Sequence, residues 1–406
     1  MKSFLNEKQI VIGVSGGIAA YKSSELIRIL KKQGADIKII MTENAGKFVG
    51  ALTFKALSGQ DVCAGLFDGK DGGSIRHIEW AEEADAVVIA PATANIIGKL
   101  ANGIADDALS TFMLAVTSPV IICPSMNTHM YESRPVQRNL NTLEADGYII
   151  IEPEEGELAC GTTGAGRLPE PHYIADRLIS TMFPSDLKGK KVLVSAGPTR
   201  EPIDPVRYIS NHSSGKMGYA VARAGEYRGA DVTLISGPTS LPPVAGVKMV
   251  SIESACEMAD AVFDQAENAD IIIKVAAVAD YHPKSISEHK IKKEEDVLSL
   301  TLDKNLDILK ELGSRKKDQF LVGFAAETRD LDQNALKKMK EKNLDMIAGN
   351  LVGGSSSGFG SDTNQVTLYF SDGAKENLPV LTKDEVAHIL FDRILVSMDG
   401  GRPAGK

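Results

Sequence analysis

Short runs of branched apolar residues that alternate with helix-like segments constrain the fold of this chain more than any other feature. The run "QIVIGVSGG" (9–17) ends in glycines, and "IAAYKSSELIRILKKQG" (18–34) then places apolar residues at helical spacing before Gly34. "ADIKIIMTENA" (35–45) is the next apolar run. Continuous apolar runs of this kind are typical of buried parallel strands, so these residues predict one strand–helix–strand unit.

The same pattern begins again near residue 190. "KKVLVSAGPT" (190–199) resembles the opening run, so the chain contains a weak internal repeat. Further strand-like or helical segments follow at 84–95 and 119–127 in the first half, and at 215–230, 231–237, 269–281, 319–328 and 344–350 in the second. The alternation predicts an α/β fold with two doubly wound, Rossmann-like domains. We place the boundary in "STMFPSDLKGKK" (180–191) and expect domains 1–185 and 188–400.

Charge and cysteine usage narrow the class of protein. The formal net charge of −9 argues against a nucleic-acid surface, although local basic pockets for phosphates remain compatible with it. No apolar run reaches the roughly 18 residues that a membrane span needs, and the N-terminus leads into a strand pattern without a signal peptide. The four cysteines, Cys63, Cys123, Cys160 and Cys256, are far apart and form no CxxC motif. We therefore expect a cytoplasmic protein with neither a membrane nor a nucleic-acid partner.

Open α/β sheets bind ligands at the carboxyl ends of their strands, so the segment after each strand carries the first candidates. In "GVSGGIAAYKS" (13–23) the backbone amides of Ser15, Gly16 and Gly17 could cradle a phosphate at a helix N-terminus. The turn lacks the spacing of GxGxxG and of the P-loop. A tight strand–helix turn without a ligand explains these residues equally well.

Two further strand ends in the first half carry polar side chains. In "IAPATANIIGKLANGIADDALST" (89–111), small residues would let a flat ring lie against backbone, and Thr93 and Asn95 supply hydrogen bonds. Asp106 and Asp107 could bind a ligand or cap the next helix. In "CPSMNTHMY" (123–131), Asn127 could hold a carboxylate or a ring carbonyl, or simply form a turn.

His77 and Cys160 are the candidate proton-transfer groups. A lone histidine such as His77, in "SIRHIEWA" (74–81), is more often structural than catalytic. Cys160 lies in "ACGTTGAGRLPEP" (159–171), a glycine-rich stretch, whereas structural cysteines usually lie in apolar segments. An exposed thiol on a loop that can close favours chemistry, for example as a proton donor.

Together, "GVSGGIAAYK", "APATANIIGKLANGIADD", "PSMNTHMY" and "ACGTTGAGRLPEP" resemble the FMN-dependent cysteine decarboxylases, above all the decarboxylase half of the bifunctional coenzyme A biosynthesis enzymes. The resemblance implies that His77, Asn127 and Cys160 act on the substrate. FMN would make the cysteinyl end an electron sink, CO2 would leave from the carboxylate held by Asn127, and Cys160 would donate the proton. The resemblance also implies FMN binding by Ser15, Gly16, Gly17, Thr42, Thr93 and Asn95.

This chain departs from that family pattern at two positions. Thr162 stands where the family usually has aspartate, and Tyr131 stands where many members have tryptophan. We expect these differences to affect the details of the substrate clamp rather than the reaction.

In the second half, "SAGPTREPIDPVRYISNHSSGKMG" (195–218) is a long polar stretch between a strand and a helix. Arg207 and Asn211 could meet an anionic, amide-bearing substrate, and Ser213–Gly215 could contact a phosphate. The alternative is that this stretch is an ordered loop that binds no ligand. Its length argues against that alternative, because long loops in compact domains are usually functional.

Acidic and basic side chains follow later strands of the second half. Asp280, in "KVAAVADYHP" (274–283), could hold Mg2+ beside a triphosphate or could be a cap. The lysines of "HKIKK" (289–293), and Lys338 and Lys342 at i, i+4 spacing, are solvated surface charges by default. Together these clusters suggest a nucleotide site.

"GPTREPIDPVRYISNHSSGKMG", "AAVADY", "KIKK" and "GFAAET" are similar to the phosphopantothenate–cysteine ligase half of the same family, which uses CTP and Mg2+. The resemblance implies that Asp280 serves the metal and that Asn211 and Arg207 act on an acyl-cytidylate. Leu306 stands where a proline is common. The CTP-binding residues implied are Lys274, Val275, Ala276, Asp280, Lys290, Asn305, Leu306, Asp307, Ile308, Phe324, Lys338 and Lys342.

The two implied reactions are consecutive. The ligase would join cysteine to 4'-phosphopantothenate, and the decarboxylase would convert the resulting 4'-phospho-N-pantothenoylcysteine to 4'-phosphopantetheine. The resemblance also implies a homo-oligomer: trimers of the flavin half with FMN between subunits, dimers of the ligase half, and a dodecamer from their combination.

Three other hypotheses compete with this one. A flavoprotein that decarboxylates a peptide's C-terminal cysteine does not explain the second half. A non-catalytic binding protein on the same fold does not explain why His77 and Cys160 are present. An NAD dehydrogenase would need GxGxxG with an acidic residue about 20 positions further on, and the sequence has no such motif.

Overall fold

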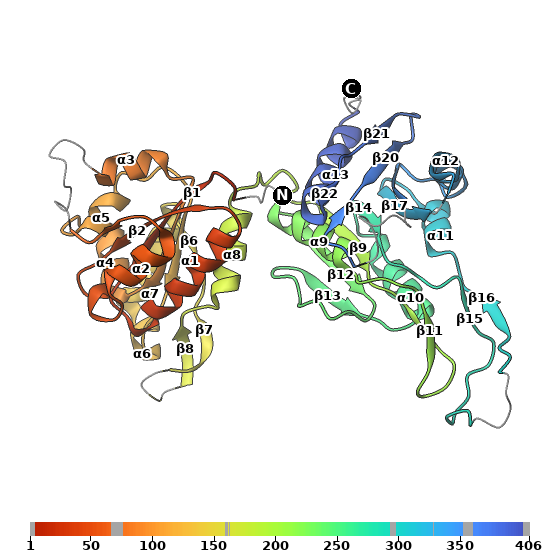
Figure 1. Ribbon diagram of the computed structural model, residues 1–406, viewed down its shortest axis with the longest axis horizontal. Helices are drawn as coiled ribbons and strands as arrows, with labels where there is room; N and C mark the ends of the chain where they lie inside the picture. Colours follow the sequence, from red (N-terminus) through yellow and green to blue (C-terminus); the bar gives the residue numbers. More distant parts are fainter. Residues whose placement is uncertain are drawn as a thin grey trace. The chain divides into compact units, whose positions relative to one another are not determined.

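In the computed structural model, which describes residues 5–65, 76–158, 161, 163–292, 298–327, 329–351 and 360–400, each half of the chain folds around its own sheet (Figure 1). The chain divides into two compact units between Phe183 and Pro184. Each unit is described by itself below.

The sheet of the first unit has six strands in the order β3-β2-β1-β4-β5-β6, and all neighbours are parallel. This is the doubly wound order, in which the chain winds outward from the centre in both directions. Its strands are β1 (Gln9–Val14), β2 (Asp36–Met41), β3 (Val62–Cys63), β4 (Ala86–Ala92), β5 (Val120–Pro124) and β6 (Ile149–Ile150). Every residue of β4 is buried, as a strand covered on both faces requires.

Helices cover both faces of this sheet (Figure 1). On one face, α1 (Lys22–Lys32) packs between α2 (Ala51–Ser58) and α8 (Pro171–Ser180). On the other face the core is closed by α3 (Arg76–Glu83), α4 (Ala94–Ala101), α5 (Ala108–Met113) and α7 (Arg134–Ala145). Short elements connect them: η1 (Ile18–Tyr21), η2 (Ala45–Lys47), α6 (Thr128–Tyr131) and the hairpin of β7 (Glu154–Glu157) with β8 (Thr163–Arg167).

The sheet of the second unit repeats the same order and then extends it. Its eight strands run β13-β12-β9-β14-β17-β18-β20-β21, and only the last two pairs are antiparallel. The strands are β9 (Lys191–Ala196), β12 (Asp231–Ser236), β13 (Lys248–Ser251), β14 (Ile271–Lys274), β17 (Phe320–Glu327), β18 (Met346–Leu351), β20 (Val366–Phe370) and β21 (Lys375–Asn377). The predicted α/β class with two doubly wound domains is confirmed.

Two groups of helices cover the second sheet. On one face α9 (Lys216–Tyr227) packs against α13 (Lys383–Met398), and on the other lie α10 (Ala255–Ala266), α11 (Ile308–Arg315) and α12 (Leu331–Glu341). Three small ribbons lie outside the sheet: β10 (Arg200–Pro202) with β11 (Tyr208–Ser210), β15 (Tyr281–Pro283) with β16 (Leu302–Lys304), and β19 (Thr363–Asn364) with β22 (Leu381–Thr382).

Local differences from the predicted elements fall where the chain leaves the sheet. The helix predicted at 18–34 begins with the 3-10 turn η1. The strand predicted at 269–281 ends at Lys274, and the following residues make only an isolated bridge, between Ala277 and Pro198. Both departures place irregular backbone at the carboxyl end of a strand, where a ligand can reach its polar groups.

Candidate active sites

The first unit has a cavity of about 950 Å³ at the carboxyl ends of its central strands. The strand order reverses between β1 and β4, and a crevice at that point is the usual ligand site of an open α/β sheet. Seven of the nine residues expected to serve this half line the cavity: Ser15, Gly16, Gly17, Thr42, Thr93, Asn95 and Asn127.

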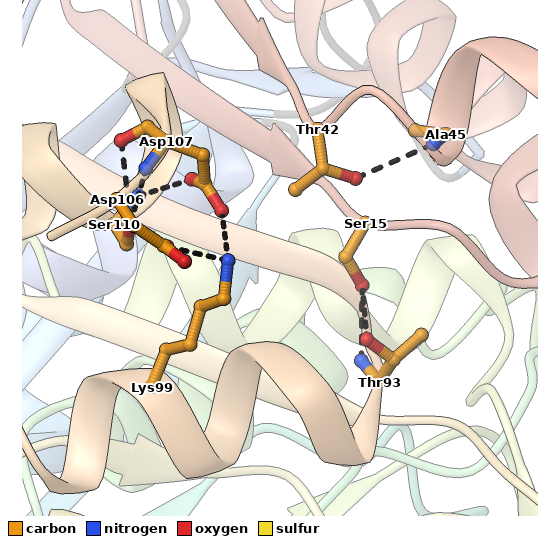
Figure 2. Close-up of polar contacts among 8 residues, drawn as sticks. All are labelled: Ser15, Thr42, Ala45, Thr93, Lys99, Asp106, Asp107 and Ser110. Carbon is orange, nitrogen blue, oxygen red and sulfur yellow. Dashed lines mark hydrogen bonds and ion pairs between the residues drawn. The ribbon is translucent and has the colours of Figure 1, made fainter. Parts of the chain in front are cut away.

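Hydrogen bonds join the glycine turn after β1 to the loop after β4. The buried Ser15 hydroxyl donates to the carbonyl of Pro91 at 2.8 Å and accepts from the backbone N–H of Thr93 at 3.0 Å (Figure 2). At Gly16, a Cβ atom would lie 2.4 Å from Cβ of Asn44, so the turn can approach the strand end beside it only with glycine. The two segments that the sequence indicated separately therefore form one wall.

Thr42 continues this wall from the end of β2. Its backbone N–H donates to the carbonyl of Val14 at 3.0 Å, and its hydroxyl oxygen accepts from the N–H of Ala45 at 3.3 Å (Figure 2). Asn95 lies in the first turn of α4, next to the N-cap residue Thr93.

A lysine between two aspartates forms another part of the cavity wall (Figure 2). Nζ of Lys99 lies 2.6 Å from Oδ1 of Asp106 and 2.7 Å from Oδ2 of Asp107, and these hydrogen bonds raise the pKa of Lys99. Asp107 also accepts from the N–H of Ser110 at 2.8 Å in the capping box of α5. Burial alone would raise the pKa of Asp107, but Lys99 and Ser110 more than offset this and lower it. Asp107 therefore caps a helix and faces the cavity as well.

Asn127 lies at the N-cap of α6, where its Oδ1 accepts from the N–H of His129 at 2.9 Å. The β7–β8 hairpin packs directly on this segment, because the carbonyl of Gly166 accepts from the N–H of Met126 at 3.0 Å. A Cβ on Gly166 would lie 2.1 Å from the Met126 carbonyl oxygen. Cys160 and Thr162 fall between β7 and β8 in the sequence and lie outside the described residues. His77 lies in α3, and its side chain is also outside the described part of the structure.

The second unit has a cavity of about 650 Å³ at the equivalent point, where β9 and β14 lie side by side. The amide Nδ2 of Asn211 donates to the carbonyls of Ala277 and Val278, at 3.3 and 3.0 Å. The expected residues that line the cavity are Asn211, Lys274, Val275, Ala276, Asp280, Asn305, Leu306, Asp307, Ile308, Phe324, Lys338 and Lys342.

Each of the two α12 lysines forms an ion pair at this cavity. Lys338 pairs with Glu327 at 2.6 Å, and Lys342 pairs with Asp307 at 2.8 Å. Asp307 also caps α11 by accepting from the N–H of Lys310 at 3.0 Å. Burial alone would raise the pKa of Asp307, but these bonds lower it. From their spacing alone, Lys338 and Lys342 would be solvated charges on a helix face. In the structure they line a cavity.

Lys274 is the most unusual charge of the second unit. Its side chain points to the face covered by α10, where Nζ lies 3.4 Å from Sδ of Met258, and the residue is only 7% exposed. Burial lowers the pKa of Lys274 to about 7, and the carboxylate of Asp307 opposes only part of that shift.

Two of the residues expected in the ligase site, Arg207 and Lys290, do not line the cavity. Nη2 of Arg207 lies 2.6 Å from Oδ2 of the buried Asp204 and donates to the carbonyl of Ile291 at 2.7 Å. Burial alone would raise the pKa of Asp204, but Arg207 and backbone amides hold it well below its usual range. Lys290 is exposed and adjoins Ile291, so Arg207 fixes the segment that carries Lys290.

Sequence reasoning missed several polar residues of this cavity, namely Lys216, Lys304, Asn350, Asn364 and Lys383. Lys216 adjoins the phosphate-cradle candidate Gly215 and could have been suspected. No sequence motif contains Asn350, Asn364 or Lys383. The order of the strands in the sheet brings these residues to the cavity.

The fold and the two cavities define a two-unit α/β protein with a separate cavity at the carboxyl edge of the sheet in each unit. The family model described as "Flavoprotein" matches residues 2–183, and that described as "DNA/pantothenate metabolism flavoprotein C-terminal domain" matches residues 187–398. No helix within the described residues has both the length and the apolar character needed to cross a membrane.

Full-length relatives agree with both matches. The chain is 50% identical over 394 residues to the "Coenzyme A biosynthesis bifunctional protein CoaBC" of Bacillus subtilis (strain 168), covering 96% of this chain and 97% of that protein. It is 44% identical over 397 residues to the protein of the same description from Escherichia coli (strain K12), covering 97% and 98%. A crystal structure of the C-terminal domain of such a protein is 44% identical, covers 53% of this chain and 99% of that one, and has a TM-score of 0.47.

The chain therefore belongs to the family of bifunctional coenzyme A biosynthesis proteins. The expected function, a bifunctional enzyme of coenzyme A biosynthesis that joins a flavoprotein decarboxylase to a ligase, is confirmed at that level. The competing hypotheses of a peptide decarboxylase, a binding protein and an NAD dehydrogenase lose their basis, because the matches extend over both units.

Proposed function

We propose that residues 188–400 form a CTP-dependent phosphopantothenate–cysteine ligase and residues 1–185 an FMN-dependent phosphopantothenoylcysteine decarboxylase. The observation that carries this proposal is that most of the residues implied for each reaction line one cavity at the topological switch point of their unit. The substrates would be 4'-phosphopantothenate, cysteine and CTP.

In the ligase, the carboxylate of 4'-phosphopantothenate attacks the α-phosphate of CTP and expels pyrophosphate, which forms an acyl-cytidylate. The amine of cysteine then displaces CMP and forms the amide. The Asn211 amide, fixed by two backbone carbonyls, is positioned at this cavity to orient the acyl-cytidylate. Lys338 and Lys342 can help to neutralise the charge of the nucleotide.

Mg2+ would enter this site with the triphosphate. The carboxylate of Asp280 lines the cavity, and protein sites for Mg2+ commonly supply only one or two carboxylates beside phosphates and water. Among the described residues no group of three or more His, Cys, Asp or Glu side chains could hold a metal, which fits a cation carried by the nucleotide.

Arg207 and Lys290 remain proposals for the same reaction. Arg207 is bound to Asp204 and to the backbone beside Lys290, so the two cations would approach a nucleotide together. We propose that Arg207 acts on the acyl-cytidylate and Lys290 on the phosphates of CTP.

In the decarboxylase, the residues that line the first cavity fit FMN. The backbone amides of Ser15, Gly16 and Gly17 would hold the phosphate, and Thr42, Thr93 and Asn95 would hold the ring and ribityl chain. When bound, FMN would supply a reversible two-electron oxidation, which makes the cysteinyl end of the substrate an electron sink and is reversed by hydride return after CO2 has left. Asn127 would orient the carboxylate that leaves, with His77 beside the substrate, and Cys160 would return a proton.

Exposed apolar side chains support the proposed homo-oligomer. Ile18 and Tyr21, 59% and 60% exposed, line the flavin cavity, and Phe48 and Leu52 are 49% and 78% exposed. Exposed apolar side chains on the first unit, two of them at the rim of the cavity, fit a trimer contact next to FMN. In the second unit, Val206, Tyr208 and Tyr281 are 59%, 49% and 51% exposed, which fits a dimer contact, and both symmetries together would give a dodecamer.

We also propose a cytoplasmic location, supported by free thiols at Cys123 and Cys256.

The test is to incubate the purified protein with 4'-phosphopantothenate, cysteine, CTP and Mg2+ and to identify products by mass spectrometry. Conversion to 4'-phosphopantetheine with CMP and pyrophosphate is expected. Cys160→Ser should stop the pathway at or after ligation while CMP release continues. Absence of both CMP and the cysteine adduct would contradict the ligase assignment, and an adduct that accumulates in the FMN-loaded wild type would contradict the decarboxylase assignment.

A further inference from the structure

Besides Lys274 and Lys304, the ligase cavity has two pairs of lysines, and only one pair belongs to the expected CTP site. Lys338 and Lys342 come from the end of α12, on the sheet face covered by α10, α11 and α12. Lys216 and Lys383 are the first residues of α9 and α13, which cover the opposite face. All four lysines line the same cavity, so the cavity spans the carboxyl edge of the sheet from one face to the other.

Lys216 and Lys383 converge on the short segment 360–362. Nζ of Lys216 lies 2.6 Å from Oδ1 of Asp362 and donates to the carbonyl of Gly360 at 3.0 Å. Nζ of Lys383 donates to the carbonyl of Ser361, and its backbone N–H donates to the carbonyl of Asp362 at 3.1 Å. Two ammonium groups are thereby held on one stretch of backbone.

The charge balance of this cluster favours an anion. Burial, and then repulsion from Lys216, lower the pKa of Lys383. Among the described residues no carboxylate forms an ion pair with Lys383, whereas Lys338 and Lys342 each have one. Asp362, the partner of Lys216, is 81% exposed and can turn into solvent without a desolvation cost. A bound anion would relieve the repulsion between the two lysines.

Neutral amides lie beside these cations. Oδ1 of Asn350 is buried and has no hydrogen-bond partner within the described part of the chain. Asn364 is only 6% exposed and also lines the cavity. A buried amide oxygen without a donor is costly, so a ligand that supplies a hydroxyl or an N–H would stabilise this wall.

We propose that Lys383, together with Lys216, forms a phosphate-binding subsite of the ligase cavity, on the face of the sheet opposite Lys338 and Lys342. The N-termini of α9 and α13, both longer than two turns, add positive potential at the same place. The proposal rests on the proposed ligase function and deepens it. The phosphate has two possible sources there, the 4'-phosphate of 4'-phosphopantothenate and the β- and γ-phosphates of CTP. Asn350 favours the first, because the pantothenate moiety carries hydroxyl and N–H donors and a triphosphate has none.

The test compares the full-length variants Lys383→Met and Lys216→Met with Lys375→Met. Lys375 is a half-exposed lysine that pairs with Asp332 and does not line the cavity, so its loss serves as a control. For each variant we would measure KM for 4'-phosphopantothenate, the rate with unphosphorylated pantothenate, and the calorimetric Kd of CTP and of pyrophosphate. A lost charge-assisted contact should weaken the relevant ligand about tenfold to hundredfold.

The two sources give different patterns. If the subsite holds the 4'-phosphate, KM for 4'-phosphopantothenate rises, the preference over pantothenate falls by the same factor, and the Kd of CTP does not change. If it holds the triphosphate, the Kd of CTP and of pyrophosphate rises and the preference over pantothenate is kept. Either pattern supports a phosphate subsite.

Two results would overturn the proposal. In the first, the KM and Kd values of both cavity variants lie within about twofold of those of Lys375→Met. A difference this small is below the effect of one lost hydrogen bond. In the second, Lys383→Met weakens ligand binding and Lys383→Arg, at an unchanged Tm, does not restore it. That result would indicate that Lys383 has a structural role. Failure of the proposed function itself would be visible separately, since the wild type would then form no CMP from CTP.

Discussion

Lys274 illustrates how an environment changes what a residue does. Its position in "KVAAVADYHP" marks the end of a strand, and the resemblance places it beside the cytosine. In the structure the ammonium group points into an apolar layer against Met258, with Asp307 as the charge that partly compensates. A lysine buried in this way costs free energy at neutral pH, because charge is disfavoured in a medium of low polarity.

We expect Lys274→Met to raise the free energy of unfolding of the second unit by about 1–3 kcal/mol at pH 7. Burial lowers the pKa of Lys274 from its ordinary value of 10.5 to about 7 in the folded state, so between these values the unfolded state binds more protons at this group. Wild-type stability therefore rises with pH in this window, and the advantage of the variant should disappear as pH approaches 10.

Calorimetric scans of the full chain would test this, with the transition of the second unit identified by its shift when CTP is added. Lys375→Met is the control, and its difference from wild type should not vary in this way with pH. If Lys274→Met were less stable than the wild type by the same amount at every pH, the amine of Lys274 would make a favourable contact instead.

At the scale of elements, the β7–β8 hairpin is the part of the first unit whose position matters most for the site. Backbone packs against backbone where β8 meets the Asn127 segment, and Gly164 and Gly166 leave no room for side chains there. This contact fixes the hairpin, whose two strands flank the proposed proton donor Cys160 in the sequence, against the segment of Asn127, the residue proposed to hold the carboxylate.

We expect Gly166→Ala to lower the decarboxylation rate at least about tenfold while ligation is unchanged, because a shift of about 1 Å at a reacting geometry has effects of this order. Gly147→Ala is a suitable control. Both glycines have positive φ, at +146° and +93°, but a Cβ on Gly147 meets nothing within 4 Å. Rates of 4'-phosphopantetheine formation from the purified cysteine adduct would measure the effect. Equal losses in both variants would mean that backbone strain, and not the clash with Met126, is responsible.

At the scale of the whole molecule, the chain consists of two units with separate cores, each with its own cavity. The C-terminal part of the connecting segment 180–191 belongs to the second unit. There the buried Arg228 binds Asp186 at 2.5 Å and Asp392 at 2.7 Å. Removal of Asp186 would leave the buried guanidinium of Arg228 with one of its two carboxylate partners.

We expect chains 1–183 and 184–406, produced separately, to fold, the first as a yellow flavin-binding protein and the second as a ligase. A shorter fragment, 190–406, should lose several degrees of Tm relative to 184–406, since a weakened buried ion pair costs about 3 kcal/mol. Thermal scans and the two activity assays would decide this. An inactive 184–406 fragment at a wild-type Tm would show that the units depend on each other for catalysis, and an equal Tm for both fragments would remove the role assigned to Asp186.

Particular elements show how far the sequence leads. The apolar runs predicted the central strands of both sheets, because a strand buried on both faces leaves a local signature. The antiparallel β20 and β21 were not predicted. They extend the second sheet at its edge, and β21 is three residues long with two of them exposed. The residues after each strand were found because they sit in motifs, whereas Asn350, Asn364 and Lys383 have no local signal.

By itself, the sequence determined that this chain forms two doubly wound α/β units and that its candidate site residues lie after the central strands, because hydrophobic periodicity and turn residues act locally. The tertiary structure decided which distant side chains meet. It buried Lys274 under α10, bound Arg207 to Asp204 outside the cavity, and brought Lys216 and Lys383 to the same segment, 360–362. These pairings depend on the order in which strands and helices pack, and no local pattern of residues specifies that order.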